Sequence, residues 1–387
     1  MHGKLDCLHL ACISFRVSKK HYLLQIVSGL SPEQSIHTQP VIIVLPNRKP
    51  GIMIRIKKDG VLLKQTTLEF ENEGVLNPAT IRKGDDVLFY YRAVQHGNHS
   101  SIGFCKLSGP LIVSERMSKP ILFPEHDYEA KGLEDPRVVK IDDLYYLTYT
   151  AYDGANACGA LATSADGINF KKEGLIVAQM DFPEFEKLAS TNTALNDKYT
   201  VYNNFNHKLW DKDVVFFPRR INGKLHFLHR IKPDVQLVAI NELSELTPAF
   251  WEDYFLHFAD HILLTSKYAH EVSYVGAGCP PIETAHGWLL IYHGVHETKH
   301  GFVYVGCAAL LDLDNPMKEI ARLPHPILVP ERVWEIRGDV DNVCFPTGTA
   351  LFDDALYIYY GAGDEVIAAG VVSLKELLDE LLAHKTV

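Results

Sequence analysis

The residue best suited to chemistry in this sequence is Asp135, in the stretch Gly132-Leu-Glu-Asp-Pro-Arg-Val138. Pro136 follows it directly, and a proline restricts the backbone of the residue before it, which favours an extended conformation. The stretch continues through a turn at Asp142-Asp143 into an aromatic run, a pattern typical of a β-hairpin. We therefore expect a carboxylate presented at the mouth of a strand, where it could donate a proton to a substrate.

The same order of residues recurs four more times along the chain. Each copy has a proline, a short strand, a turn rich in Gly, Asn or Asp, and an aromatic strand, and the copies are roughly 60 to 80 residues apart. Five such units predict an all-β fold, a five-bladed β-propeller, in which residues 41–387 form a single catalytic domain. Residues 1–40 precede it as an N-terminal extension of unknown role. The anchor prolines are Pro78, Pro136, Pro218, Pro281 and Pro346.

The polar ends of these repeats should converge. In a propeller the inner strands of all blades surround one channel, so equivalent positions face one another across it. Alignment on the prolines brings Asp135 near two arginines and a histidine, a concentration of cations that favours binding of an anion. The alternative is that the arginines only tie neighbouring blades together. The aligned residues are Asn77, Asp135, Phe217, Pro280 and Phe345 before the hairpins, and Arg92, Asp153, Arg230, His293 and Asp364 after them.

The number of carboxylates limits the chemistry. An inverting glycosidase needs two of them, one to protonate the leaving oxygen and one to activate water. If inorganic phosphate is the nucleophile, the second carboxylate is unnecessary, because phosphate is already anionic and needs only cationic groups to hold it. A single presented Asp135 opposite Arg230 and His293 is the pattern expected of a glycoside phosphorylase.

Several longer stretches point to a family. They are LNPA with YYRA, GLEDPRV, KDVVFFPRRINGKLHFLHR, VGAGCPPIETAHGWLLIYHGV, and FPTG with YYGAGD. In this order, over roughly residues 70 to 372, they resemble glycoside hydrolase family 130, the β-mannoside phosphorylases. The resemblance implies a five-bladed propeller that cleaves β-mannosides, such as β-mannobiose or β-mannosyl-glucose, with phosphate. It also implies inversion, so that the product is α-mannose 1-phosphate.

The resemblance further implies roles for single residues. Asp135 would be the general acid, passing its proton through the 3-hydroxyl of the mannose. Two alternatives stay open, a β-mannosidase that uses water and a non-catalytic glycan-binding propeller, and the sequence does not separate β-1,2 from β-1,4 linkages. The implied sugar-binding positions are Asn77, Arg92 and Asp364, to which the alignment of the repeats adds Asp153, and the implied phosphate-binding positions are Lys212, Arg230, His293 and Tyr304.

Composition excludes several other classes. The formal charge of −10 and the pI near 6.0 argue against a nucleic-acid or anionic-membrane partner. No apolar run approaches the roughly 18 residues needed to span a bilayer. The seven cysteines are scattered and odd in number, as expected for reduced core thiols in a cytoplasmic protein. We expect no metal and no cofactor besides phosphate as co-substrate, and the sequence leaves open whether the chain forms a homo-oligomer.

Elements outside the repeats are less clearly marked. A strand is expected at 21–27, further strands at 41–45 and 51–56, and a turn at 57–60. A strand from this N-terminal part would close the ring by pairing with the last blade. Residues 182–188 predict a loop or short helix. Ser373 begins a capping pattern followed by leucines at helical spacing, which predicts a short amphipathic C-terminal helix.

Overall fold

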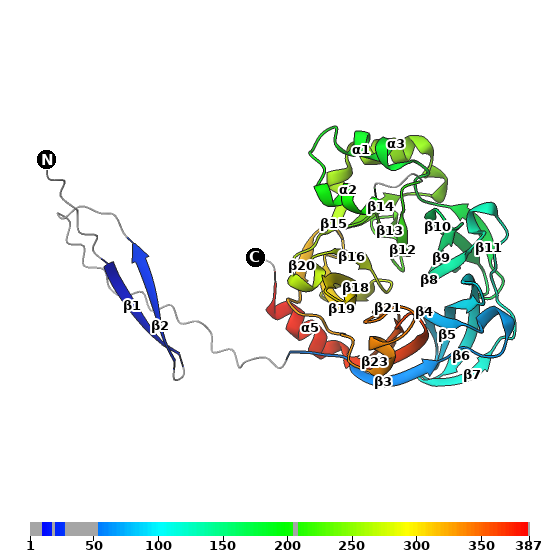
Figure 1. The fold of residues 1–387 in the computed structure, drawn as a ribbon, viewed down its shortest axis with the longest axis horizontal. Helices are drawn as coiled ribbons and strands as arrows, with labels where there is room; N and C mark the ends of the chain where they lie inside the picture. The colour runs from blue at the N-terminus through cyan, green and yellow to red at the C-terminus, as the bar shows by residue number, and fades with distance from the viewer. Residues whose placement is uncertain (1–9, 18–19, 28–52, 204–207, 386–387) are drawn as a thin grey trace. The chain divides into compact units, whose positions relative to one another are not determined.

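The computed structural model describes residues 10–17, 20–27, 53–203 and 208–385 (Figure 1). The chain divides into two compact units, Met1–Gly51 and Ile52–Val387. In the first unit, β1 (Leu10–Val17) pairs antiparallel with β2 (Lys20–Val27), which confirms the strand expected at 21–27. The strand expected at 41–45 lies outside the described residues.

The described part of the second unit forms five blades of antiparallel strands that follow one another around a ring, and this confirms the predicted propeller (Figure 1). The first two blades make one continuous eight-stranded sheet, because β6 and β8 are joined by a parallel bridge between Ser100 and Gly132. In each blade the first strand lies towards the centre of the ring and the last at its edge (Figure 1). From the centre outwards, the first blade has β4 (Gly74–Lys83), β5 (Asp86–Gln95), β6 (His99–Ser108) and β7 (Ile112–Arg116). The second blade has β8 (Gly132–Ile141), β9 (Leu144–Tyr152), β10 (Ala157–Ser164) and β11 (Lys171–Leu175), and the third has β12 (Lys212–Phe216), β13 (Leu225–Arg230), β14 (Val235–Ile240) and β15 (Ile262–Leu264). The fourth blade has β16 (Tyr274–Ala277) and β17 (Ile282–Thr284), then β18 (Gly287–Thr298), β19 (Gly301–Leu311) and β20 (Glu319–Arg322), and the fifth has β21 (Cys344–Phe352), β22 (Ala355–Ala362), β23 (Val366–Ser373) and β3 (Lys57–Leu63).

The ring closes through β3, which comes from the N-terminal side and pairs antiparallel with β23 of the last blade. The closing strand was therefore predicted correctly, but its position was not. Residues 53–56 are not in a strand, and the expected turn at 57–60 is instead the beginning of β3. Gly60, at φ 119°, lies beside an irregularity of the ladder, so the Asp-Gly pair forms a distortion inside a strand and not a turn.

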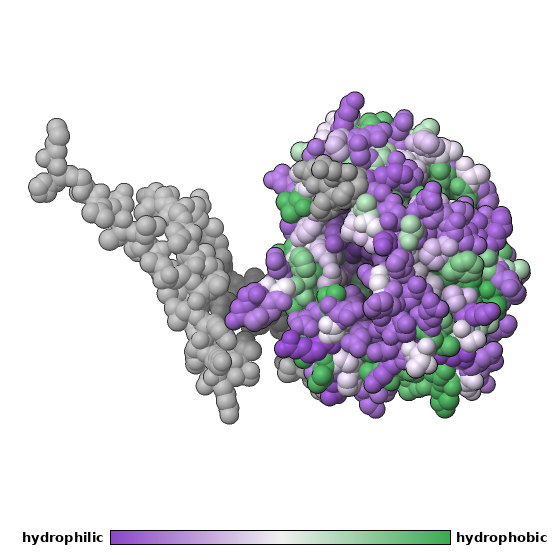
Figure 2. Space-filling view, turned by 45° about the vertical axis from the view of Figure 1, so that its right-hand side comes forward, coloured by the Kyte–Doolittle hydropathy of each residue, from purple (hydrophilic) through white to green (hydrophobic). Residues whose placement is uncertain are grey.

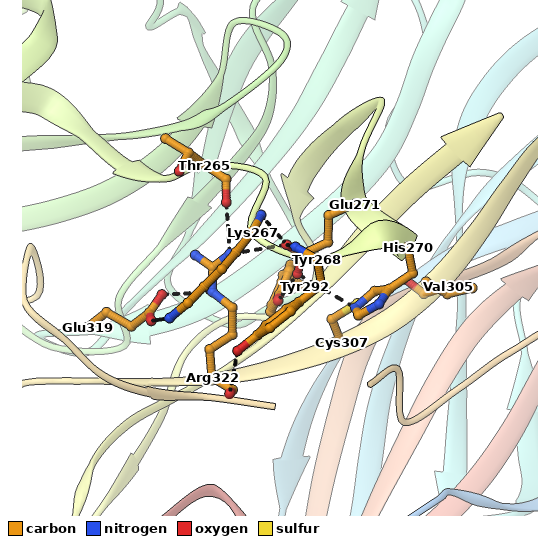
Figure 3. Close-up of polar contacts among 10 residues, drawn as sticks. All are labelled: Thr265, Lys267, Tyr268, His270, Glu271, Tyr292, Val305, Cys307, Glu319 and Arg322. Atoms are coloured by element: carbon orange, nitrogen blue, oxygen red, sulfur yellow. Dashed lines mark hydrogen bonds and ion pairs between the residues drawn. The ribbon is translucent and has the colours of Figure 1, made fainter. Parts of the chain in front are cut away.

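Buried acidic residues hold the inner strands to their blades. In the fourth blade Glu271 accepts hydrogen bonds from the hydroxyl of Tyr292 and, at 3.2 Å, from Arg322 (Figure 3). It also accepts from the backbone N–H groups of Lys267 and Tyr268, at 2.8 and 3.1 Å. Such a buried carboxylate is stable only because all of its partners are present. Equivalent sets are Glu71 with Tyr91 and Arg116, Glu129 with Tyr149 and Lys172, and Glu335 with Tyr360 and Lys58, while the third blade uses Asp211, His229 and Tyr254.

Helices lie outside the blades. The helix expected near 182–188 is α1, and the C-terminal helix is α5, where Ser373 Oγ accepts from the N–H of Glu376 at 3.1 Å. The helices α2 and α3 were not predicted, and they gather with α1 beside the third blade (Figure 1). In α3 the buried side chains are aromatic, and aromatic residues favour strands as readily as helices. The helices are α1 (Phe182–Ala189), α2 (Asp197–Asn203), α3 (Pro248–Leu256), α4 (Val333–Ile336) and α5 (Leu374–Ala383), with short 3₁₀ turns η1 (Glu69–Glu71), η2 (Asp127–Glu129), η3 (Leu243–Glu245), η4 (Phe258–His261) and η5 (Ala269–Glu271).

Two further predictions from the sequence concern membrane-spanning segments and the cysteines. Helices of sufficient length and apolarity to cross a membrane are absent from the described residues. The cysteines of the propeller are buried free thiols, as predicted; they are Cys105, Cys158, Cys279, Cys307 and Cys344.

Candidate active site

Left-handed bulges in the inner strands shape the candidate site. Asn77, Asp135 and Asp213 lie within β4, β8 and β12 at φ 50°, 49° and 53°, and each coincides with a shift in the strand register. Asp and Asn tolerate this conformation better than most residues, and such bulges redirect side chains. The expectation of an extended Asp135 at the mouth of a strand is therefore wrong, because the bulge overrides the preference that Pro136 imposes.

The bulges also correct the alignment of the repeats. The third repeat was anchored on Pro218, which placed Phe217 opposite Asp135. In the structure the equivalent residue is Asp213, and Phe217 lies beyond the end of β12. The error arose because Val214, and not a proline, follows the bulged residue in this blade.

One side of the site is an acidic group with two cations. Asn77 Nδ2 donates to Asp135 Oδ1 at 2.7 Å, so bulges of neighbouring blades are in direct contact. The carboxylate of Glu134 joins Arg92 Nη2 at 2.9 Å to Lys212 Nζ at 3.3 Å. Arg92 Nη1 lies 3.6 Å from Asp135 Oδ1. Arg92 and Asn77 therefore lie where the sequence placed them, whereas Glu134 was given no role.

The other side is a cationic group around Arg230. Its Nη1 lies 2.9 Å from His293 Nε2 and 2.9 Å from Asp213 Oδ2. Tyr304 is hydrogen-bonded to Tyr274, and its ring centroid is 6.2 Å from that of His293. The structure thus brings together Arg230, His293 and Tyr304, as the sequence suggested. The expectation of a single carboxylate is wrong, because Glu134 and Asp213 are also present, each held in an ion pair, and the charges of Asp135, Arg92 and Lys212 act on the buried carboxyl of Asp364.

The charges of the site determine where protons lie. Burial by itself would raise the pKa of Asp135, but the charges of Arg92 and Lys212 outweigh it and lower the pKa. Burial, and then the charge of Asp135, raise the pKa of Asp364 to about 6. Asp135 is therefore ionised at neutral pH, and Asp364 is the acid nearer to its titration range.

His293 is neutral and has a defined tautomer. Burial, followed by the charges of Arg230 and Arg137, lowers its pKa well below the usual range. Because the guanidinium of Arg230 can only donate, Nε2 of His293 must accept, and the ring proton is on Nδ1. The buried atoms of the site with no hydrogen-bond partner among the described residues include both oxygens of Asp213, of which Oδ2 is in the ion pair with Arg230. They also include His293 Nδ1, Arg230 Nε and Asn77 Oδ1. Buried polar atoms are normally paired, so these three atoms indicate a place for a polar ligand. The surface around the hollow of the propeller face is mostly hydrophilic, which agrees with such a ligand (Figure 2).

Two further residues of the site had not been singled out from the sequence. Arg137 is buried and donates to the backbone carbonyls of Asp135, at 2.9 Å, and of Gly278 in the fourth blade. It therefore holds the bulge of Asp135 in place across the ring. Its signal in the sequence was its position in the Asp-Pro-Arg motif. Gly276 faces His293 in the ladder of β16 and β18.

Asp153 lies apart from these groups. Its carboxylate accepts from the backbone N–H groups of Ala155 and Asn156, at 2.8 and 2.7 Å, and from Asn156 Nδ2 at 2.7 Å. These bonds form the turn between β9 and β10. Among the described residues, Asp153 bonds within this turn and not to the other candidate site residues, so the alignment of the repeats misplaced it.

A substitution of Gly276 tests whether the site depends on this close packing. A Cβ at this position would overlap the ring of His293 and lie 2.6 Å from Asp213 Oδ2. We expect Gly276→Ala to lower turnover by roughly a hundredfold, since small displacements of reacting groups have effects of this size. The control is Gly74→Ala at the start of β4, where the nearest atom would be 3.4 Å away. Equal activities of the two variants in a steady-state assay would contradict this expectation.

One group in the described residues has the composition of a metal site. Single ligand atoms of His270, Glu271 and Cys307 lie within 4.8 Å of one another (Figure 3). However, the carboxylate of Glu271 is already bonded to Tyr292 and Arg322. Burial also raises the pKa of the Cys307 thiol well above its usual range, and metals bind the thiolate. We interpret this group as part of the repeated scaffold.

Comparison with known proteins identifies similar sequences of named activity. A family model described as β-1,4-mannooligosaccharide phosphorylase matches residues 55–382. A 1,2-β-oligomannan phosphorylase and a β-1,2-mannobiose phosphorylase, both of Thermoanaerobacter sp. (strain X514), are 34% and 32% identical to this chain over 341 residues. Each alignment covers 84% of this chain, and 99% and 98% of the two relatives.

A solved structure shows the same fold. The β-1,2-mannobiose phosphorylase from Listeria innocua, in complex with β-1,2-mannobiose, aligns with a TM-score of 0.65 and 24% identity. The alignment covers 86% of this chain and 100% of that structure. The propeller, and not an N-terminal or C-terminal part of it, is therefore what the proteins share.

Proposed function

This chain belongs to glycoside hydrolase family 130, and from that premise we propose that it cleaves β-mannosides with inorganic phosphate. The sugar is released from its β-linkage with inversion, as α-mannose 1-phosphate. The observation that carries this proposal is the pair Arg230 and His293, with buried donors that lack partners among the described residues. Lys212 links this pair to the acid, because the charges of both Asp135 and Arg230 act on it. Guanidinium and neutral imidazole N–H groups are well suited to bind phosphate oxygens.

Asp213, the carboxylate that lies against Arg230, does not favour a hydrolase. A water-using enzyme needs a carboxylate free to act as a base. Asp213 Oδ2 lies 2.9 Å from Arg230 Nη1, so its charge is engaged by the cation that would otherwise bind phosphate. In the proposed reaction a phosphate oxygen attacks the anomeric carbon, the glycosidic bond breaks, and the leaving oxygen receives a proton that originates on Asp135.

Phosphate binding prepares the acid for this step. By themselves, the charges of Arg92 and Lys212 lower the pKa of Asp135. A phosphate dianion beside Lys212 would offset that positive charge and raise the pKa, because a nearby negative charge disfavours a carboxylate. Asp135 thus becomes a proton donor once the co-substrate is bound. We assign Asn77, Arg92 and Asp364 to the sugar, and Lys212, Arg230, His293 and Tyr304 to phosphate.

We further propose that the linkage is β-1,2. This rests on the names of the two relatives that align over nearly their whole length, both of which act on β-1,2-mannosides by name.

The test is a panel of β-1,2-mannobiose, β-1,4-mannobiose and β-mannosyl-glucose, each incubated with and without phosphate. We expect turnover of β-1,2-mannobiose only with phosphate, and mannose 1-phosphate as the product. Release of free mannose without phosphate would contradict phosphorolysis, preference for another disaccharide would contradict the linkage, and absence of any turnover would favour a binding protein.

A further inference from the structure

A third cation, Lys232, lines the same pocket as two of the proposed phosphate residues. It follows Arg230 by two positions, just beyond the end of β13. The pocket has a volume of about 130 Å³, enough for a small anion. Lys212 and Arg230 line it as well, together with residues of α2. Its lining residues besides the three cations are Val201, Tyr202, Asn203 and Trp210.

The ammonium group of Lys232 has no counter-charge of its own among the described residues. Its Nζ lies 4.1 Å from the centroid of the Tyr274 ring, and Arg230 Cζ lies 5.5 Å from the same centroid. Asp213 is the carboxylate whose charge acts on Lys232, but it is paired with Arg230. A cation–π contact stabilises a cation by less than is needed to offset burial of a full charge.

The surroundings of Lys232 explain the protonation state of its amine. The charged or titratable groups facing it are Arg230 on its own segment, Lys212 and Asp213 from β12, Tyr274 from β16 and Tyr202 from α2. Burial, followed by the charges of Arg230 and Lys212, lowers the pKa of Lys232 to about 7. The amine is therefore only partly protonated at neutral pH, and an anion in the pocket would restore its charge.

We propose that Lys232 is a further phosphate-binding residue, which takes up a proton as inorganic phosphate enters the pocket beside Lys212 and Arg230. The inference rests on the proposed function, because it concerns the co-substrate of the same reaction. Phosphate fits the site better than the sugar does, since three cations converge on a small volume.

The direction of the pH dependence follows from this assignment. The anion favours the protonated amine, so the contribution of Lys232 to phosphate binding is complete below about pH 7 and is lost as the pH rises above that value. We expect Lys232→Met to raise the KM for phosphate by about tenfold near pH 6, with a smaller ratio to wild type near pH 8. The KM for β-1,2-mannobiose should change by less than about twofold, as expected for loss of a contact to one substrate.

Lys232→Arg separates charge from titration. It keeps a permanent cation, so its KM for phosphate should depend less on pH than that of wild type. The ionisation of phosphate itself is common to all variants and cancels in their ratios. The control is Lys198→Met on α2, a half-buried lysine whose Nζ donates to the carbonyl of Val272 at 2.7 Å.

Calorimetry provides a second measurement that does not depend on the Met variant. Phosphate titrations of wild type in buffers of different ionisation enthalpy should show proton uptake near pH 7 that is reduced in Lys232→Arg. Any uptake by Asp135 contributes in both proteins. Equal proton uptake, or a phosphate KM unchanged in Lys232→Met, would overturn the role of Lys232. A wild-type enzyme that turns over β-mannosides without phosphate would instead overturn the proposed function.

Discussion

Replacement of Asp135 by Asn is expected to lower the rate of phosphorolysis at least about a hundredfold while the propeller stays folded, since loss of a general acid has effects of this size. The amide matches the carboxylate in shape, and Asn tolerates the left-handed backbone at φ 49°. It has no proton to donate at neutral pH. Turnover of β-1,2-mannobiose and a thermal melt, measured on the same preparation, give both quantities.

The matched control for this variant is Asp143→Asn at the far end of the same hairpin. Asp143 also has a positive φ of 67°, and its side chain is 98% exposed, so the same chemical change is made without touching the site. We expect wild-type activity for Asp143→Asn. If Asp135→Asn retained more than about a tenth of the wild-type rate at equal stability, Asp135 would not be the acid.

Replacement of Arg230 by Ala is expected to raise the KM for phosphate by roughly ten- to a hundredfold, and the KM for the mannoside far less. The guanidinium is a charge-assisted donor to one substrate only. The variant should also be less stable by about 3–5 kcal/mol, because Asp213, which is 3% exposed, loses its ion-pair partner. A lower melting temperature is therefore expected whether Arg230 binds phosphate or only braces the blades, and the two KM values decide between these roles.

Arg322→Ala is a suitable control for the loss of stability. Arg322 is buried, as Arg230 is, with exposed fractions of 3% and 7%. It is paired with the buried Glu271, but it lies in the outer part of the fourth blade. We expect a comparable fall in melting temperature and an unchanged KM for phosphate. Arg230→Lys should recover only part of the phosphate affinity, since an ammonium cannot reproduce the planar donor geometry of a guanidinium. Similar losses for both substrates in Arg230→Ala would mean that Arg230 is structural.

The repeat, the propeller and the approximate position of the site residues could be predicted from the sequence. Turn residues and aromatic strands are local signals, and a fivefold repeat converts them into equivalent positions around a ring. This is why Arg92, Arg230 and His293 could be placed near Asp135 without coordinates. It is also why the error at Phe217 occurred, since an alignment based on prolines has no information where the proline is missing.

The pairing of the side chains in the site depends on the tertiary structure and could not be predicted from the sequence. The left-handed bulges at Asn77, Asp135 and Asp213 direct side chains from separate blades towards one another, and their backbone conformation is imposed by the ladders on either side. The charge state of the site depends on distances between residues far apart in the chain, such as Arg230 and His293 at 2.9 Å. Burial and neighbouring charges, which set the proton positions on His293 and Lys232, exist only once the ring has closed.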